Sequence, residues 1–295
     1  MPRPVILLDA NVLIPFDPRD TLLKAAEHSL CRAACSEAIL DEARRNFAKV
    51  RKSGDAAEKA RQADALVDAL REYFRSAYAM IEGYERHIPR MRNDPKDRHV
   101  TAAAWQVGRG TIIVTFNTRD FRAEHLAPFH LAALRPDPFL MRLFRANPDE
   151  CAAIVREQAR ERRRPPMSAG EILDGLATDA PAYAKAVREH MGLLFVPLAE
   201  GEIARLRAIP RNAHEHIDDL VARAVQAWIT SPRSSAAIPA RRPKDATTGV
   251  TVEIPDFIVA AVRRISGEQR LPLALADAVG RWSPISSPPE AREEN

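Results

Sequence analysis

The 295-residue sequence has few cysteines and few glycines, and each scarcity excludes a class of site. Its three cysteines, Cys31, Cys35 and Cys151, form no CxxC pair and are too few for a disulfide scaffold, so we expect them to be small buried hydrophobic residues. With 11 glycines, the chain has neither a GxGxxG nor a GxxxxGK[ST] loop. Zinc and thiol chemistry and the two commonest nucleotide-binding loops are therefore excluded.

Long apolar runs are also missing. No run approaches the roughly 18 to 20 residues that span a bilayer, and the apolar start Val5–Leu8 is interrupted at once by Asp9. We therefore expect neither a membrane helix nor a signal peptide, and we expect a cytoplasmic protein. With 46% hydrophobic and 28% charged positions, the chain can bury one large core or two smaller ones. Its net charge of +4 permits an anionic partner without requiring one.

Two short apolar runs indicate the fold of the first half. Val5–Leu8 and residues 111–115 are continuous and bounded by turn residues, as in strands that are buried on both faces. Between them, apolar residues such as Ile39, Ala43 and Phe47 recur at helical spacing, and residues 56–74 repeat the pattern. Strands alternating with helices over roughly 140 residues predict an α/β layer fold with a central, mostly parallel sheet.

The second half has a different character. We expect helices at 149–164 and 168–176, a linker rich in Ser, Pro and Arg at 231–249, a strand at 250–254, a helix at 255–265 and a frayed tail from 286. The acidic and histidine-containing stretch 214–219 is interpreted as the polar start of a helix rather than as a metal site. The C-terminal region is therefore predicted to be mainly helical.

Acidic residues follow the predicted strands. Asp9 stands at the carboxyl end of the first strand, the edge where open α/β sheets bind ligands, although a lone carboxylate there can also cap the next helix. Because parallel pairing would bring the end of the second strand to the same edge, we expect Asn117 and Asp120 to lie near Asp9. This convergence favours a site over a simple cap.

Two further segments add carboxylates. Asp94, just before Pro95, has the form of a helix cap, and Asp97 could complete a capping box with it. Asp97 lies at helical spacing from Val100, so its carboxylate should face the sheet and need a partner. Glu42 flanks the apolar face of its own helix and is significant only in combination with the other acids.

Gathering Asp9, Glu42, Asp97 and Asp120 in one pocket is unfavourable unless a cation neutralises them. Oxygen ligands without cysteine or histidine select a hard ion, Mg²⁺ or Mn²⁺, which would activate a water molecule against a phosphodiester. The four acids are the candidates for metal binding and catalysis. Nearby side chains would orient these ligands or a water molecule, and we expect them to be those of Asn11, Asp94, Thr115 and Asn117.

The order and spacing of these motifs resemble a PIN domain over residues 3–145, with a three-layer fold. The motifs are the strand and Asp9-Ala10-Asn11 after it, Glu42, Asp97 with its small-residue helix, and residues 113–121. The resemblance is closest to VapC-type toxins. It implies a four-acid Mg²⁺ or Mn²⁺ site at Asp9, Glu42, Asp97 and Asp120, cleavage of RNA, inhibition by a cognate antitoxin protein, and a homodimer.

The chain departs from that pattern in its length, because VapC-type toxins are usually about half as long. We divide it into a PIN-like nuclease domain at 1–145, a helical extension at 146–192 that is similar to one found in some PIN proteins, and a region of undetermined role at 193–295. The strand and helix at 250–265 have a faint similarity to DNA-binding antitoxin modules.

Three functions remain open. The leading hypothesis is a metal-dependent endoribonuclease, the toxin of a type II toxin-antitoxin pair. The second is a module that keeps the acidic metal pocket and binds RNA or a protein partner with little or no turnover. The third, a phosphatase that forms an aspartyl phosphate, is weaker because Asn11 stands where those enzymes have a second aspartate.

Overall fold

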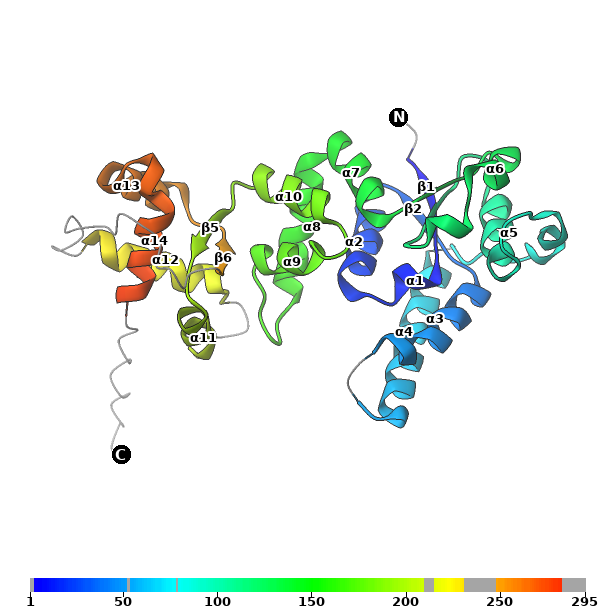
Figure 1. Ribbon diagram of the computed structural model, residues 1–295, viewed down its shortest axis with the longest axis horizontal. Helices are drawn as coiled ribbons and strands as arrows, with labels where there is room; N and C mark the ends of the chain where they lie inside the picture. The colour runs from blue at the N-terminus through cyan, green and yellow to red at the C-terminus, as the bar shows by residue number, and fades with distance from the viewer. Residues whose placement is uncertain (1–2, 52–53, 78, 210–214, 231–247, 283–295) are drawn as a thin grey trace. The chain divides into compact units, whose positions relative to one another are not determined.

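The computed structural model describes residues 3–51, 54–77, 79–209, 215–230 and 248–282 (Figure 1). The chain forms two compact units: the first comprises Met1–Val155 and Leu173–His190, and the second comprises Arg156–Ile172 and Met191–Asn295. Within the described ranges, no helix is both long enough and apolar enough to cross a membrane.

The first unit is built on a four-stranded sheet whose strands are all parallel, in the order β2-β1-β3-β4. The strands are β1 (Val5–Leu8), β2 (Arg32–Ala34), β3 (Ile112–Val114) and β4 (Ala132–Leu134). The two central strands β1 and β3 are almost wholly buried, which accounts for their continuous apolar sequences. The predicted α/β fold around a parallel sheet is confirmed, although β3 is shorter than the predicted run 111–115.

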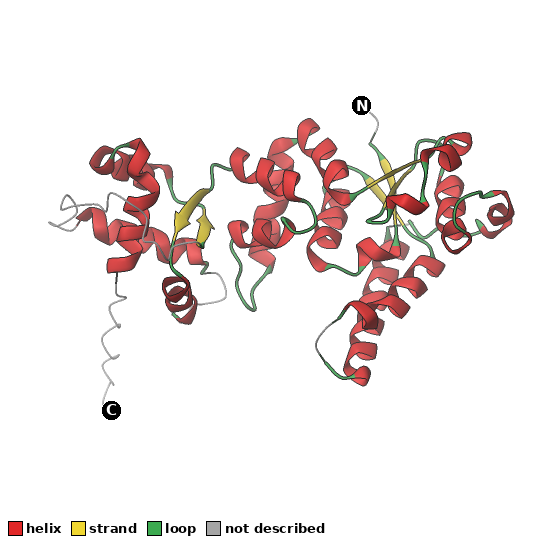
Figure 2. Ribbon diagram, viewed as in Figure 1, coloured by secondary structure: helices red, strands yellow, loops and turns green. Residues whose placement is uncertain are grey.

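Helices connect the parallel strands, as the crossovers between such strands require (Figure 2). α5 packs against both β1 and β3, and α3 packs against α4. The helices that lie wholly in this unit are α1 (Ala10–Leu13), α2 (Phe16–Glu27), α3 (Glu37–Val50), α4 (Ala56–Ser76), α5 (Arg98–Val107), α6 (Ala123–Leu126), α7 (Pro136–Ala146) and α10 (Pro181–His190). Short 3-10 turns are η1 (Glu85–Arg90), η2 (Pro95–Asp97), η3 (Thr118–Asp120) and η4 (Ala127–Phe129).

Two helices cross the boundary between the units: α8 (Pro148–Glu161) and α9 (Ala169–Leu176). They lie close to the predicted ranges 149–164 and 168–176. The three cysteines are free and buried, as their number and spacing predict. The three-part division of the chain by role, at 145 and 192, remains a prediction.

The second unit is mainly helical and has its own core. An antiparallel pair of strands, β5 (Leu194–Pro197) and β6 (Gly249–Val252), is accompanied by α11 (Glu200–Ala208), α12 (Ile217–Thr230), α13 (Asp256–Ser266), η5 (Glu268–Arg270) and α14 (Leu271–Arg281). Fully buried residues of its core include Val196, Leu220, Val225, Val262 and Leu275. The predicted tail from 286 and all but the last two residues of the predicted linker 231–249 lie outside the described residues.

Candidate active site

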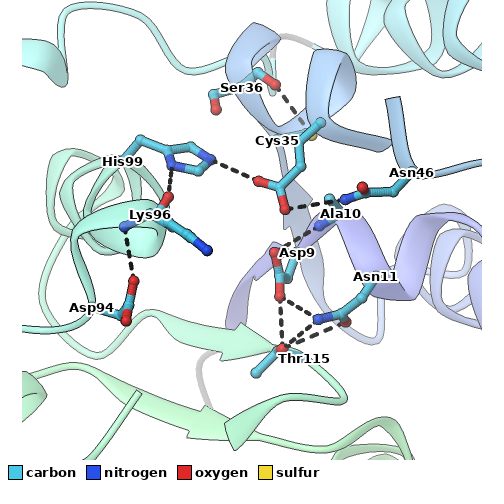
Figure 3. Close-up of polar contacts among 11 residues, drawn as sticks. Asp9, Ala10, Asn11, Cys35, Ser36, Asn46, Asp94, Lys96, His99 and Thr115 are labelled. Carbon is cyan, nitrogen blue, oxygen red and sulfur yellow. Dashed lines mark hydrogen bonds and ion pairs between the residues drawn. The ribbon is translucent and has the colours of Figure 1, made fainter. Parts of the chain in front are cut away.

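Asp9 is the most deeply buried acid of the proposed site, with 3% of its surface exposed. It follows β1 and caps α1, where its Oδ1 accepts a 2.8 Å hydrogen bond from the backbone nitrogen of Ala10. Its Oδ2 accepts two more hydrogen bonds of 2.7 Å, from the amide of Asn11 and from the hydroxyl of Thr115 (Figure 3). The carboxylate is therefore both a helix cap and a link to the neighbouring strand.

The end of β3 is tied to the end of β1 by further hydrogen bonds. Leu8 pairs with Val114, so Asp9 and Thr115 are the next residues on adjacent strands. The Asn11 amide donates to Thr115 Oγ1 at 3.0 Å, and Asn11 Oδ1 accepts from the backbone nitrogen of Phe116 at 2.9 Å. The start of α1 and the segment after β3, which are remote in sequence, are thereby fixed against each other.

Asp120 comes to the same edge through η3. The side-chain amide of Asn117 donates a short hydrogen bond to Asp120 Oδ2, while the backbone nitrogen of Asn117 donates to Thr115 Oγ1 at 3.0 Å. Thr115 therefore connects Asp9 with the segment that carries Asp120.

Asp94 caps the short turn η2, where its Oδ1 accepts a 3.0 Å hydrogen bond from the backbone nitrogen of Lys96 (Figure 3). The alternative of a capping box completed by the Asp97 side chain is not seen. Asp97 is half-buried at the start of α5 and makes no side-chain cap. Among the described residues, no hydrogen bond or ion pair compensates the charge of its carboxylate.

Glu42 projects from α3 toward the start of α5. Its Oε2 lies 3.4 Å from Nε2 of His99, and its Oε1 accepts a long, 3.5 Å hydrogen bond from the Asn46 amide. His99 Nδ1 lies 2.8 Å from the carbonyl oxygen of Lys96 and must donate to it, since a carbonyl only accepts. The sequence analysis did not identify His99, because nothing in the sequence shows that its ring reaches a helix 57 positions away.

Electrostatics show that the acids are close together. Burial raises the pKa of Asp97 to about 6, with further increases from the negative charges of Asp9, Asp120, Glu42 and Asp94, in that order. Burial also raises the pKa of Asp9, and the charge of Glu42 adds to this, although the hydrogen bond from Thr115 opposes it. The charges of Asp9, Glu42 and Asp120 therefore all act on Asp97 at this edge of the sheet.

The pKa of His99 responds to the same cluster. Burial lowers it, but contact with Glu42, the hydrogen bond to the Lys96 carbonyl and the charge of Asp9 outweigh burial, so the pKa lies above its ordinary value. When protonated, the His99 imidazole beside Glu42 compensates part of the negative charge on the α3 side. Asp97 has no such neighbour.

The donor set suits a hard divalent cation. Within the residues that the structure describes, no three or more side chains of histidine, cysteine, aspartate or glutamate form a ready-made metal cage. Mg²⁺ does not require one, because it keeps several waters and is usually held by one or two carboxylates together with substrate phosphate. Asp97, which has no compensating partner, and the carboxylates whose charges act on it are oxygen groups of the kind that such an ion takes.

Two comparisons with known proteins found a similarity. Residues 136–189 match the family model described as the VapC50 C-terminal domain. A protein of Mycobacterium tuberculosis (strain ATCC 25618 / H37Rv) named "Putative ribonuclease VapC50" is 34% identical over 110 residues, which are 37% of this chain and 64% of that protein. The match thus spans less than two thirds of the relative's own length. No solved structure matches the chain.

The family model covers α7, α8, α9 and all but the last residue of α10, and it overlaps most of the predicted helical extension at 146–192. The two comparisons therefore confirm the resemblance of this chain to VapC-type PIN ribonucleases that carry a C-terminal extension.

Proposed function

We propose that this chain is a metal-dependent endoribonuclease with a PIN-like first unit. The observation that carries the proposal is the convergence of Asp9, Glu42, Asp97 and Asp120 at one edge of a parallel sheet, with Asp97 lacking a compensating partner. Similarity to a protein named as a ribonuclease supports the same conclusion.

In this proposal the four carboxylates hold one or two Mg²⁺ or Mn²⁺ ions. A bound cation of this kind lowers the pKa of water and stabilises the charge that develops on a phosphodiester. Thr115 and Asn11 hold the Asp9 carboxylate in one orientation, and Asn117 does the same for Asp120. His99 holds the carboxylate of Glu42. Asp9, Glu42 and Asp120 are therefore positioned before substrate binds, which is what efficient catalysis requires.

A cleavage assay tests the proposal. The full chain with Mg²⁺ should shorten a single-stranded RNA, and EDTA should stop the reaction. Asp97→Asn should lower the rate by at least about 100-fold, an effect of the size that loss of one electrostatic group produces, whereas the exposed Glu72→Gln on α4 should cleave as the wild type does. Undiminished cleavage in EDTA would contradict the proposal.

The biological role that we propose is that of a toxin in a type II toxin-antitoxin pair, acting as a cytoplasmic homodimer. Expression of the chain in a bacterial host should then arrest growth, and Asp97→Asn should relieve the arrest at equal protein level. A short neighbouring gene whose product binds the chain and restores growth would identify the antitoxin.

The second function, a binding module that retains the acidic pocket and has little or no turnover, uses the same acids. The charges of Asp9, Asp120 and Glu42 act on Asp97 in either case. Calorimetry with Mg²⁺ together with the cleavage assay separates the two functions, because tight metal binding without cleavage of any RNA indicates the module.

A further inference from the structure

An arginine-rich pocket adjoins the acidic site in the first unit. It has a volume of about 360 Å³ and is lined by four arginines, Arg92, Arg98, Arg119 and Arg122. Asp94 and Asp120, two of the acids that raise the pKa of Asp97, line the same pocket. The pocket therefore adjoins the acidic site, and Asp120 belongs to both.

The four guanidinium groups are available to a ligand to different degrees. Arg92 and Arg119 are exposed, and neither makes an ion pair or a side-chain hydrogen bond in the described part of the chain. Arg98 uses only its Nε, which donates to the carbonyl oxygen of Asn93 at 3.2 Å. Arg122 lies 3.7 Å from Glu124, and both side chains are exposed. Most of the guanidinium N–H donors therefore remain free.

Charge explains why such a pocket belongs beside an acidic site. A cluster of carboxylates repels a polyanion, so a nucleic acid needs separate cationic groups to hold its backbone nearby. The planar guanidinium matches two phosphate oxygens at once, which lysine does not. Arg98 follows Asp97 in sequence and Arg119 precedes Asp120, and both arginines line the pocket that Asp120 also lines.

We propose that this pocket is a subsite for an RNA phosphate next to the one that is cleaved, with Arg92 and Arg119 as its main contacts. The proposal rests on the proposed function for the identity of the substrate, but its residues are distinct from the four acids. It assigns to these arginines binding and alignment of the RNA backbone rather than the chemical step.

Binding without metal tests the subsite separately from cleavage. Fluorescence anisotropy would measure the affinity of the full chain for a labelled single-stranded RNA in EDTA, with gel analysis showing that the RNA stays intact. The double change Arg92→Gln with Arg119→Gln should weaken binding by at least 10-fold. The slope of log affinity against log salt should also become shallower by about one to two. Each phosphate contact that is lost means that fewer counterions are released when the RNA binds.

Matched variants make the outcome specific. Arg61→Gln, an exposed arginine on α4, should bind as the wild type does. Arg119→Lys, which keeps the charge and loses the planar fork, should fall between the wild type and Arg119→Gln. Circular dichroism and melting temperature should be unchanged in every variant, since the replaced side chains are exposed.

Cleavage with Mg²⁺ then distinguishes the two proposals. The subsite predicts that the double variant raises KM with little change in kcat. If no RNA is cleaved by the wild type but binding still depends on Arg92 and Arg119, the nuclease proposal fails and the subsite stands. If the double variant binds RNA like the wild type, or if Arg61→Gln weakens binding equally, the subsite is overturned whatever the cleavage assay shows.

Discussion

The hydroxyl of Thr115 donates a 2.7 Å hydrogen bond to the carboxylate of Asp9, which lies 106 positions earlier in the chain. This bond joins the ends of the two central strands and favours the charged form of a buried acid. It is therefore expected to affect both the stability of the first unit and the state of the proposed metal ligand.

Replacing Thr115 with valine tests this role. Thr115→Val keeps the shape of the side chain but leaves Asp9 Oδ2 with the Asn11 amide alone, which should cost about 1 to 3 kcal/mol of unfolding free energy. Mg²⁺ affinity should fall by about 10- to 100-fold, as when the partner of a metal ligand is removed. Urea unfolding and calorimetry measure the two effects. Thr115→Ser retains the hydroxyl and should restore most of both, and a valine variant equal to the wild type in both would refute the role.

Neutralising Asp97 should stabilise the metal-free protein. The raised pKa of about 6 means that the folded state disfavours the ionised carboxylate, so this group costs stability as pH rises from about 4 to 6, and the full cost remains at pH 7. After allowance for solvent screening of a half-exposed group, Asp97→Asn should gain on the order of 1 kcal/mol, or about 2 to 4 °C in Tm.

Thermal melting in EDTA at pH 4 and pH 7 measures that gain. The variant and the wild type should melt together at the lower pH and separate at the higher one. Glu72→Gln, which removes an exposed charge on α4, should show no such separation. Equal melting of Asp97→Asn and wild type at pH 7 would mean that the cluster carries no net repulsion.

Divalent cations should stabilise the wild type more than the Asp97→Asn variant. Binding to the folded state alone raises stability by about 2.7 kcal/mol when the cation is present at 100 times its Kd. Melting in a Mg²⁺ titration should therefore show a rise in Tm for the wild type and a smaller rise for the variant. NaCl of equal ionic strength is the control, and an equal effect of the two salts would argue against a specific site.

The second unit should lose stability as pH rises because of Asp218. Burial raises the pKa of this acid to about 7, opposed by hydrogen bonds from the Glu253 backbone and Ser168 and increased by the charges of Glu253 and Asp219. Since the unfolded state ionises near pH 4, the stability that depends on Asp218 is present below pH 4 and lost as pH rises toward 7. Asp218→Asn should flatten this dependence.

Tryptophan fluorescence can follow that unit alone. Of the three tryptophans, Trp228 and Trp282 lie in the second unit. In a Trp105→Phe background, all tryptophan fluorescence therefore comes from the second unit. Denaturant midpoints at pH 5 and pH 7.5 would then be compared with and without Asp218→Asn. An unchanged pH dependence in the variant would show that Asp218 is not responsible.

The central strands were predictable from sequence because burial on both faces leaves a continuous apolar run, as in Val5–Leu8. The strands β2 (Arg32–Ala34) and β4 (Ala132–Leu134) were not predicted, because three residues rich in alanine carry no periodicity and gain their strand conformation only by pairing with β1 and β3. Sequence reasoning therefore found the middle of the sheet and missed its edges.

The same distinction applies to the site. The predicted proximity of Asp9, Asn117 and Asp120 depends on parallel pairing, which the pattern of the chain indicates. The contact between His99 and Glu42 depends on how two helices pack, and so does the pocket formed by the four arginines. Packing of this kind leaves no local signal in the residues involved. Whether the four acids bind a metal ion remains a prediction.

The parallel pairing of β1 with β3 also determines when this edge of the protein can exist during synthesis. β3, which completes the edge at the carboxyl end of β1, is made some hundred residues after β1. Non-local pairings of this kind form only after the intervening chain is available. A ribosome making this chain is therefore not exposed to an assembled acidic site on its own nascent product until residues beyond Thr115 have emerged.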